Sequence, residues 1–148
     1  MLVTWSGIAT LVRPLPEAEF SAAPFAGVFN EACQAGLHIT VHAGEWAGAA
    51  NVSQAIELLG AERIGHGVRV LEDEDVIQLA HERQTVFEVC ITSNYQTGVF
   101  NETQEHPLLR MLALGLNVVL GTDDPSISGI DLQHEYRRAC HQAGLSRQ

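Results

Sequence analysis

Short apolar runs alternate with helical apolar patterns along most of this chain. The runs predict β-strands at residues 37–41, 63–65, 85–91 and 117–120. Apolar side chains at helical spacing predict helices at residues 24–35, 52–59, 72–83, 107–115 and from Asp131 onward, and a glycine follows each helix except the third. Alternation of strands and helices predicts an α/β fold, in which helices cover a parallel sheet.

Two architectures fit this alternation, an open doubly wound sheet and a barrel. The sequence has no Gly-x-Gly-x-x-Gly or Walker-type loop after any predicted strand, which disfavours the nucleotide-binding forms of the open sheet. An eight-fold barrel uses about 250 residues, or about 31 for each strand–helix unit. If the fold is a barrel, residues 1–148 are therefore expected to form one domain with about five of the eight strand–helix units.

The composition and charge of the chain disfavour several classes of partner. The formal net charge of −10 disfavours binding to nucleic acid or to anionic membrane surfaces. The sequence has no apolar run of the length that crosses a bilayer, and its first residues lack the basic and apolar regions of a secretory signal. Cys33, Cys90 and Cys140 are widely spaced and odd in number, so we expect reduced thiols in a cytoplasmic protein.

Polar side chains cluster where the predicted strands end. Because the carboxyl ends of parallel strands meet at one edge, we expect these side chains to converge, and His, Glu and Asp together suit metal-assisted chemistry at a bound zinc ion. A nearby carboxylate can accept and return the proton of an attacking water. The candidates are His42, Glu45, His66, Ser93, Asn94, Asp123 and Asp124.

Each candidate also has a purely structural interpretation. His42 alone is a common kind of structural histidine, and Asp123-Asp124-Pro125 alone is a turn with an Asx cap. His66 lies between two glycines, which permit close approach of a ligand. Glu88 is either a buried side chain supporting the site or a solvent-facing one. The other histidines lie outside the strand ends; His38 is expected to be structural, and His81, His106, His134 and His141 are expected at the surface.

Four motifs in order resemble the adenosine deaminase family. The resemblance runs from about Glu19 to Tyr136, and a small departure is Ile91, where the family commonly has proline. Residues 1–14 diverge from the family's pattern. The motifs are Val41-His42-Ala43-Gly44-Glu45, Arg63-Ile64-Gly65-His66-Gly67, Glu88-Val89-Cys90-Ile91-Thr92-Ser93-Asn94 and Gly121-Thr122-Asp123-Asp124-Pro125.

This resemblance implies a (β/α)₈ TIM-type barrel with one Zn²⁺, of which the chain represents about the last four to five strand–helix units. It implies hydrolysis of adenosine to inosine and ammonia. By motif, His42 and Asp123 are zinc ligands and Glu45 protonates the purine ring nitrogen beside the attacked carbon. His66 orients and stabilises the attacking hydroxide, and Asp124 binds that water and the imidazole-ring nitrogen of the purine.

One departure concerns the metal. The family also uses a His-x-His pair on its first strand, and this sequence contains none, so it supplies at most two of four ligands. Alternatives therefore stay open: deamination of adenine or another adenosine-like purine, a catalytically inert fragment or binding-only subunit, and a metal-dependent ester or amide hydrolase. A partial barrel also predicts self-association through its open edges.

Overall fold

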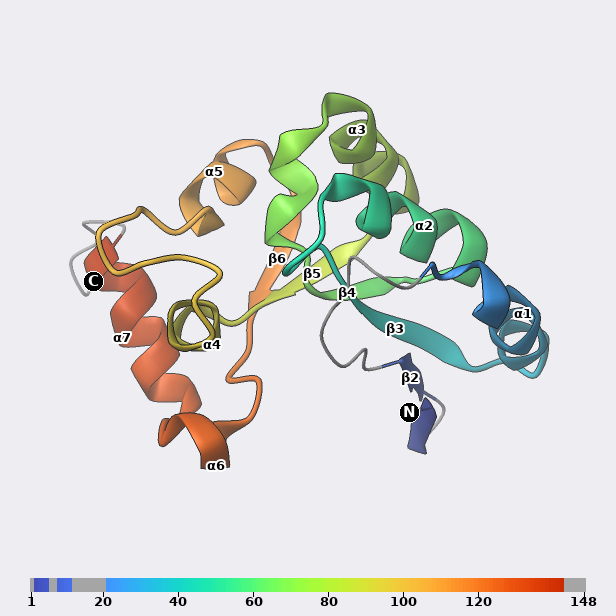
Figure 1. The fold of residues 1–148 in the computed structure, drawn as a ribbon, viewed down its shortest axis with the longest axis horizontal. Coiled ribbons are helices and arrows are strands. Elements are labelled where there is room, and N and C mark those ends of the chain that lie inside the picture. The colour runs from blue at the N-terminus through green and yellow to red at the C-terminus, as the bar shows by residue number, and fades with distance from the viewer. Residues whose placement is uncertain (1, 6–7, 12–20, 143–148) are drawn as a thin grey trace.

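Six strands form one sheet in the computed structural model, which describes residues 2–5, 8–11 and 21–142 (Figure 1). They lie side by side in the order of the sequence. Strands β1 and β2 pair antiparallel, and all later neighbours pair parallel. The strands are β1 (Leu2–Trp5), β2 (Ile8–Leu11), β3 (His38–Ala43), β4 (Arg63–His66), β5 (Val86–Val89) and β6 (Asn117–Leu120).

The strand order decides between the two architectures that the sequence left open. A doubly wound sheet reverses its strand order at a switch point, whereas a barrel adds each strand beside the last. From β2 to β6 the order never reverses, and α1, α2, α3 and α5 lie over one face of the sheet (Figure 1). The predicted α/β class is confirmed, in the singly wound form that builds barrels.

Most predicted helices are present with shifted ends. Within the described residues, helices α4, α6 and η3 and strands β1 and β2 were not predicted. Figure 1 shows α4, α6 and α7 together beyond the carboxyl ends of β5 and β6. The helices are η2 (Ala23–Phe25), α1 (Ala26–Gln34), α2 (Ala49–Leu59), η3 (Val68–Glu72), α3 (Glu74–Arg83), α4 (Ile91–Gln96), α5 (Leu108–Ala113), α6 (Pro125–Ser128) and α7 (Leu132–Gln142).

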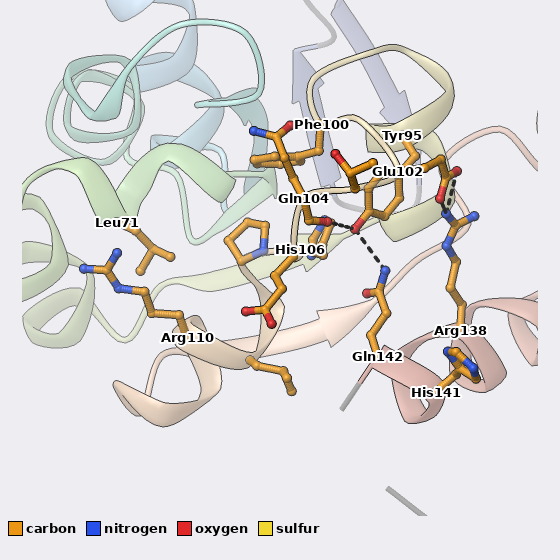
Figure 2. Close-up of a pocket in the computed structure, with 14 residues that line it drawn as sticks. Leu71, Tyr95, Phe100, Glu102, Gln104, His106, Arg110, Arg138, His141 and Gln142 are labelled. Atoms are coloured by element: carbon orange, nitrogen blue, oxygen red, sulfur yellow. Dashed lines mark hydrogen bonds and ion pairs between the residues drawn. The ribbon is translucent and has the colours of Figure 1, made fainter. Parts of the chain in front are cut away.

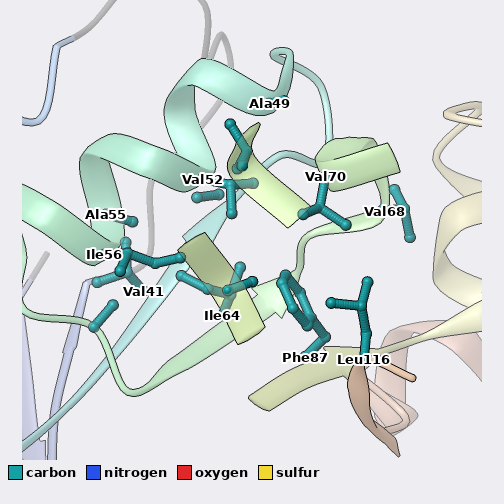
Figure 3. Close-up of a cluster of buried hydrophobic side chains, with 14 of the residues drawn as sticks. Val41, Ala49, Val52, Ala55, Ile56, Ile64, Val68, Val70, Phe87 and Leu116 are labelled. Atoms are coloured by element: carbon teal, nitrogen blue, oxygen red, sulfur yellow. The ribbon is translucent and has the colours of Figure 1, made fainter. Parts of the chain in front are cut away.

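The core lies between the sheet and its helices. Val41 of β3, Ile64 of β4 and Phe87 of β5 point to the helical side and are at most 2% exposed (Figure 3). They pack against Val52 and Ile56 of α2. This packing leaves the other face of the sheet more open, and that face carries the polar side chains of the site.

Glu88 lies on this open face. Its Oε1 accepts a hydrogen bond from Nε of Arg63 at 2.7 Å, and the Glu88 side chain is 31% exposed. Glu88 is therefore neither fully buried nor free in solvent, but paired across two neighbouring strands.

Helix ends follow the local sequence closely. Asp73 accepts a hydrogen bond from the Asp75 amide at the start of α3, and Asp131 accepts one from the His134 amide at the start of α7.

The exposure of side chains along α7 does not follow their polarity. Tyr136 is 54% exposed, whereas Glu135 is fully buried. In the part of the chain that the structure describes, helices are all too short or too polar to cross a membrane.

Candidate active site

The structure brings most of the predicted site residues together around His66. The His66 ring meets the His42 ring edge to face, with centroids 5.0 Å apart. Its Nε2 lies 3.5 Å from Oε2 of Glu45 and 3.9 Å from Oδ2 of Asp123. These side chains follow three different parallel strands, so their convergence at the carboxyl edge confirms the expected geometry.

Ser93 and Asn94 complete this cluster from α4. The Ser93 hydroxyl donates to Oδ2 of Asp123 at 2.7 Å. Nδ2 of Asn94 lies 3.3 Å from Nδ1 of His66 and 3.5 Å from Oε1 of Glu45. The sequence suggested that these two residues end a strand. They instead lie within the first turn of α4, because the strand ends at Val89.

Two of the clustered residues have unusual backbone conformations. His66 has φ 64° and Asp123 has φ 58°, and both values lie in the left-handed region that residues other than glycine rarely adopt. Such strain persists where surrounding structure fixes it, and it concentrates at functional sites. The turn at His66 aims a residue at the end of β4 toward Glu45, although strand alternation would place it over the helices.

The glycines beside His66 serve close packing within the protein. A Cβ atom on Gly65 would overlap the ring of His42, and one on Gly67 would overlap the ring of Phe87. From the sequence alone, these glycines are expected to permit close approach of a ligand. In the structure, Gly65 makes room for the His42 ring, and Gly67 lets the chain turn over the core with φ 62°.

Asp124 lies beside the cluster with a different contact. Its Oδ1 accepts hydrogen bonds from the amides of Ser126 and Ile127 at 3.0 and 3.1 Å, which caps α6. The residue is exposed. The Asx cap expected from the sequence is therefore present at Asp124, and Asp123 is the member of the pair that reaches His66.

A cavity of about 350 Å³ opens beside this cluster, on the uncovered face of the sheet. Its walls include His42, His66 and Asp123. Cys90 also lines it, and burial, reinforced by the Asp123 charge, raises the pKa of that thiol to about 12. The thiol is therefore neutral near pH 7, which disfavours Cys90 as a nucleophile.

His106 is the one misplaced histidine of consequence. The sequence predicts a surface position for it, but it is 5% exposed, and its Nε2 lies 3.1 Å from Oδ1 of Asn94. Burial, then the charges of Arg138 and His66, lower its pKa to about 4. The only local signal was its place before Pro107, where its Nδ1 accepts the Leu108 amide at the start of α5.

His106 also faces a second cavity of about 700 Å³ between the loop before α5 and helix α7 (Figure 2). There the Tyr95 hydroxyl donates to the Gln104 carbonyl at 2.8 Å and accepts from Gln142 at 3.0 Å. Arg138 stacks 4.5 Å from the centre of the Tyr95 ring. These contacts hold the loop that carries His106 against α4 and α7.

The donors available for a metal are a partial set. His42 and Asp123 line the same cavity and offer an imidazole nitrogen and a carboxylate, both of which zinc accepts. A catalytic zinc usually has three protein ligands. Among residues 2–5, 8–11 and 21–142, no group of three or more His, Cys, Asp or Glu side chains is arranged to hold a metal ion. The chemistry fits zinc, but the number of ligands does not.

Fold and site together define part of a (β/α)₈ barrel whose polar residues gather at the carboxyl ends of its strands. Comparison with known proteins gives the family. The family model described as adenosine deaminase matches residues 7–148, a wider span than the motifs delimit. The chain belongs to the adenosine deaminase family.

Its curated relatives include bacterial adenosine deaminases. The chain is 46% identical over 148 residues to the adenosine deaminase of Klebsiella pneumoniae strain 342, covering all of this chain and 44% of the relative. It is 48% identical over 132 residues to that of Escherichia coli O139:H28, covering 89% of this chain and 40% of the relative. The chain thus spans less than half the length of these relatives.

Solved structures support the same fold. An adenine deaminase from Arthrobacter aurescens superimposes with a TM-score of 0.85 at 33% identity, covering 93% of this chain and 41% of its own. An amidohydrolase with bound zinc from Burkholderia ambifaria superimposes with a TM-score of 0.76 at 26% identity, covering 86% of this chain and 36% of its own. The expected partial (β/α)₈ barrel is confirmed.

Proposed function

We propose that this chain supplies the proton-transfer part and half of the metal-binding part of an adenosine deaminase active site. The observation that supports this most directly is the cluster around His66, where Glu45 and Asp123 lie within 3.9 Å of the same imidazole nitrogen. The reaction is the hydrolysis of adenosine to inosine and ammonia. The site belongs to one partial-barrel domain spanning residues 1–148, with residues 1–14 divergent.

In this proposal, His42 and Asp123 would hold Zn²⁺ together with further ligands from outside the described residues. A bound zinc supplies a water of lowered pKa as the nucleophile. The Ser93 hydroxyl, which donates to Oδ2 of Asp123 at 2.7 Å, holds that carboxylate in place. Gly65 keeps space for the His42 ring, so the ring can approach the cluster closely.

Glu45 and His66 carry out the proton chemistry. Glu45 protonates the purine ring nitrogen beside the attacked carbon, which makes that carbon more electrophilic. With zinc bound, His66 would orient the attacking hydroxide and stabilise its negative charge electrostatically. The Glu45 side chain is 14% exposed and His66 is 2% exposed, so both act in a largely water-excluded environment. Asp124 binds the attacking water and the imidazole-ring nitrogen of the purine, which requires it to engage substrate from its place at the α6 cap.

A second candidate is deamination of free adenine. The superposition on an adenine deaminase favours it, whereas the higher identity to adenosine deaminases favours the nucleoside. We take a small purine as the partner, with no role for nucleic acid or membrane, since the net charge is −10. We assign the protein to the cytoplasm because its three cysteines are unpaired.

The test is ammonia release with zinc present. The isolated chain is assayed first, and then a chimera in which it replaces the matching 44% of the Klebsiella relative. We expect the rest of that relative to supply the remaining ligands. We expect turnover of adenosine in the chimera and a loss of about 100-fold or more in Glu45→Gln, since general acid catalysis contributes this much. Glu57→Gln, on the exposed side of α2, is the matched control and keeps full rate.

The outcomes separate the alternatives. A preference for adenine would select the second candidate. Turnover in Glu45→Gln equal to that of the unsubstituted chimera would remove Glu45 from its role. A folded chimera that binds zinc and deaminates neither purine would leave an inert or binding-only chain, and hydrolysis of esters or amides instead would select the remaining alternative.

A further inference from the structure

A row of hydrogen bonds connects His106 to the centre of the candidate site. It passes from the Leu108 amide to His106, from His106 to Asn94, and from Asn94 to His66 and Glu45. Both linking residues are buried, with Asn94 fully so and His106 5% exposed. The row starts from a backbone amide. Because this amide N–H can only donate, it determines which atom donates and which accepts in every later hydrogen bond of the row.

His106 is the first step. A backbone N–H can only donate, so Nδ1 of His106, 3.1 Å from the Leu108 nitrogen, must be an unprotonated acceptor. A neutral imidazole with bare Nδ1 carries its proton on Nε2. The low pKa of His106, about 4, keeps the ring neutral near pH 7, so this acceptor remains available.

Asn94 is the second step. Nε2–H of His106 requires an acceptor, and 3.1 Å away this is Oδ1 of Asn94. The amide group therefore turns its two donors away from His106, toward Nδ1 of His66 at 3.3 Å and Oε1 of Glu45 at 3.5 Å. The opposite orientation would set two donors against each other in a buried place, which costs free energy.

His66 is the last step. Because Nδ1 accepts from Asn94, the proton of neutral His66 lies on Nε2, the nitrogen that faces Glu45 and Asp123. We propose that His106 is a positioning residue that, acting through Asn94, fixes the tautomer and the ring orientation of His66. The consequence for catalysis rests on the proposed function, but the tautomer itself does not.

The competing explanation is that His106 only caps α5. Two substitutions separate the two roles. Gln at position 106 can place an amide N–H where Nε2–H lies, but it loses the acceptor for the Leu108 amide. Asn at position 106 places an oxygen near Nδ1 and keeps that acceptor, but it is too short to reach Asn94. His106→Gln thus retains the hydrogen bond to Asn94 but loses the acceptor that caps α5. His106→Asn retains that acceptor but loses the hydrogen bond to Asn94.

The experiment is two-bond ¹H–¹⁵N correlation NMR of the ¹⁵N-labelled chain at pH 8, where ordinary histidines are neutral. This measurement distinguishes protonated from bare ring nitrogens. We expect one tautomer of His66, with its proton on Nε2, in the unsubstituted chain and in His106→Gln. We expect a mixture of tautomers in His106→Asn. His141→Gln is the matched control, since His141 lines the same cavity as His106 and is exposed.

Two results would overturn the proposal: a His66 proton on Nδ1 in the unsubstituted chain, or an unchanged His66 in His106→Asn. Should either His106 variant fail to fold, Asn94→Asp gives the same decision, because a carboxylate cannot donate to Nδ1 and His66 is expected to move its proton there. A folded, zinc-binding chimera without deaminase turnover would refute the proposed function, whereas a single His66 tautomer in the chain would still support the role of His106. A chimera that deaminates adenosine, together with a mixture of His66 tautomers in the unsubstituted chain, would support the proposed function and overturn the role of His106.

Discussion

Single residues set the spacing of the candidate site. The His42 and His66 rings lie 5.0 Å apart, and Gly65, which pairs directly with His42 in the sheet register, has no side chain to occupy the space of the His42 ring. The Cβ that any other residue adds at Gly65 would overlap the imidazole of His42. A glycine can therefore be required by a neighbouring ring rather than by its own backbone, since the left-handed φ values of this motif belong to His66 and Gly67.

Gly65→Ala tests this spacing. We expect a loss of about 1–3 kcal/mol in the free energy of unfolding, typical of overpacking in a well-packed region, together with displacement of the His42 ring. Urea denaturation of the chain measures the loss, and the His42 ring resonances report the displacement. Gly27→Ala is the control, because a Cβ there meets nothing within 4 Å and Gly27 lies in α1. It is expected to be neutral or to stabilise by up to about 1 kcal/mol. Equal effects of the two substitutions would contradict the steric role of Gly65.

At the scale of elements, α4 positions the site. It has six residues and places Ser93 against Asp123 and Asn94 against His66. Its first turn is held from α7, where both carboxylate oxygens of the buried Glu135 lie 3.3 Å from the Thr92 amide nitrogen. A negative charge at this end also complements the helix dipole. Helix α7 therefore acts on the site through α4.

Glu135→Ala is expected to destabilise the chain by about 1–3 kcal/mol, because it leaves the buried Thr92 amide without its acceptor. Glu135→Gln keeps one carbonyl oxygen and should lose less. The midpoint of urea unfolding gives both values. Tyr136→Ala, one residue further along α7 and 54% exposed, is the control and should change stability by less than about 0.5 kcal/mol. A Glu135→Ala midpoint no lower than that of the control would mean that α7 does not hold α4.

At the scale of the whole molecule, helices α1, α2, α3 and α5 lie over one face of the sheet, and among the described residues no helix lies over the other face (Figure 1). Strand β6 ends the strand order, so within the described residues its outer edge pairs with nothing. Val119 of β6 is 41% exposed on the uncovered face. An unpaired edge next to an exposed apolar side chain favours pairing with another chain. A closed barrel would cover both features.

We therefore expect self-association of the chain that increases with concentration. Light scattering on size-exclusion fractions over a wide concentration range measures the mass. Val119→Lys should shift the chain toward the monomer, because a lysine on an edge strand opposes pairing. Leu58→Lys, at a comparably exposed position on helix α2, serves as the control and should leave the mass distribution unchanged. A monomer at every concentration would show that the open edge is protected.

The sequence by itself determined the order of the elements and the place of the chemistry. Apolar periodicity located β3 to β6 and most helices, and Asp131, where the last predicted helix begins, caps α7. The convergence of His42, Glu45, His66 and Asp123 followed from their shared position after parallel strands. These features depend on neighbours in the chain or on one general rule of parallel sheets, so a local pattern contains them.

Only the tertiary structure decided what connects these residues. The contacts of Asn94 with Glu45 and of Thr92 with Glu135 span 49 and 43 residues. The burial of His106 depends on α4 and on the loop before α5, and no periodicity records it. The same holds for the strands β1 and β2 and for Gly65, whose need for space arises from a ring on the neighbouring strand. Such features require knowing which distant segments meet, because burial and hydrogen-bond direction are properties of the packed chain.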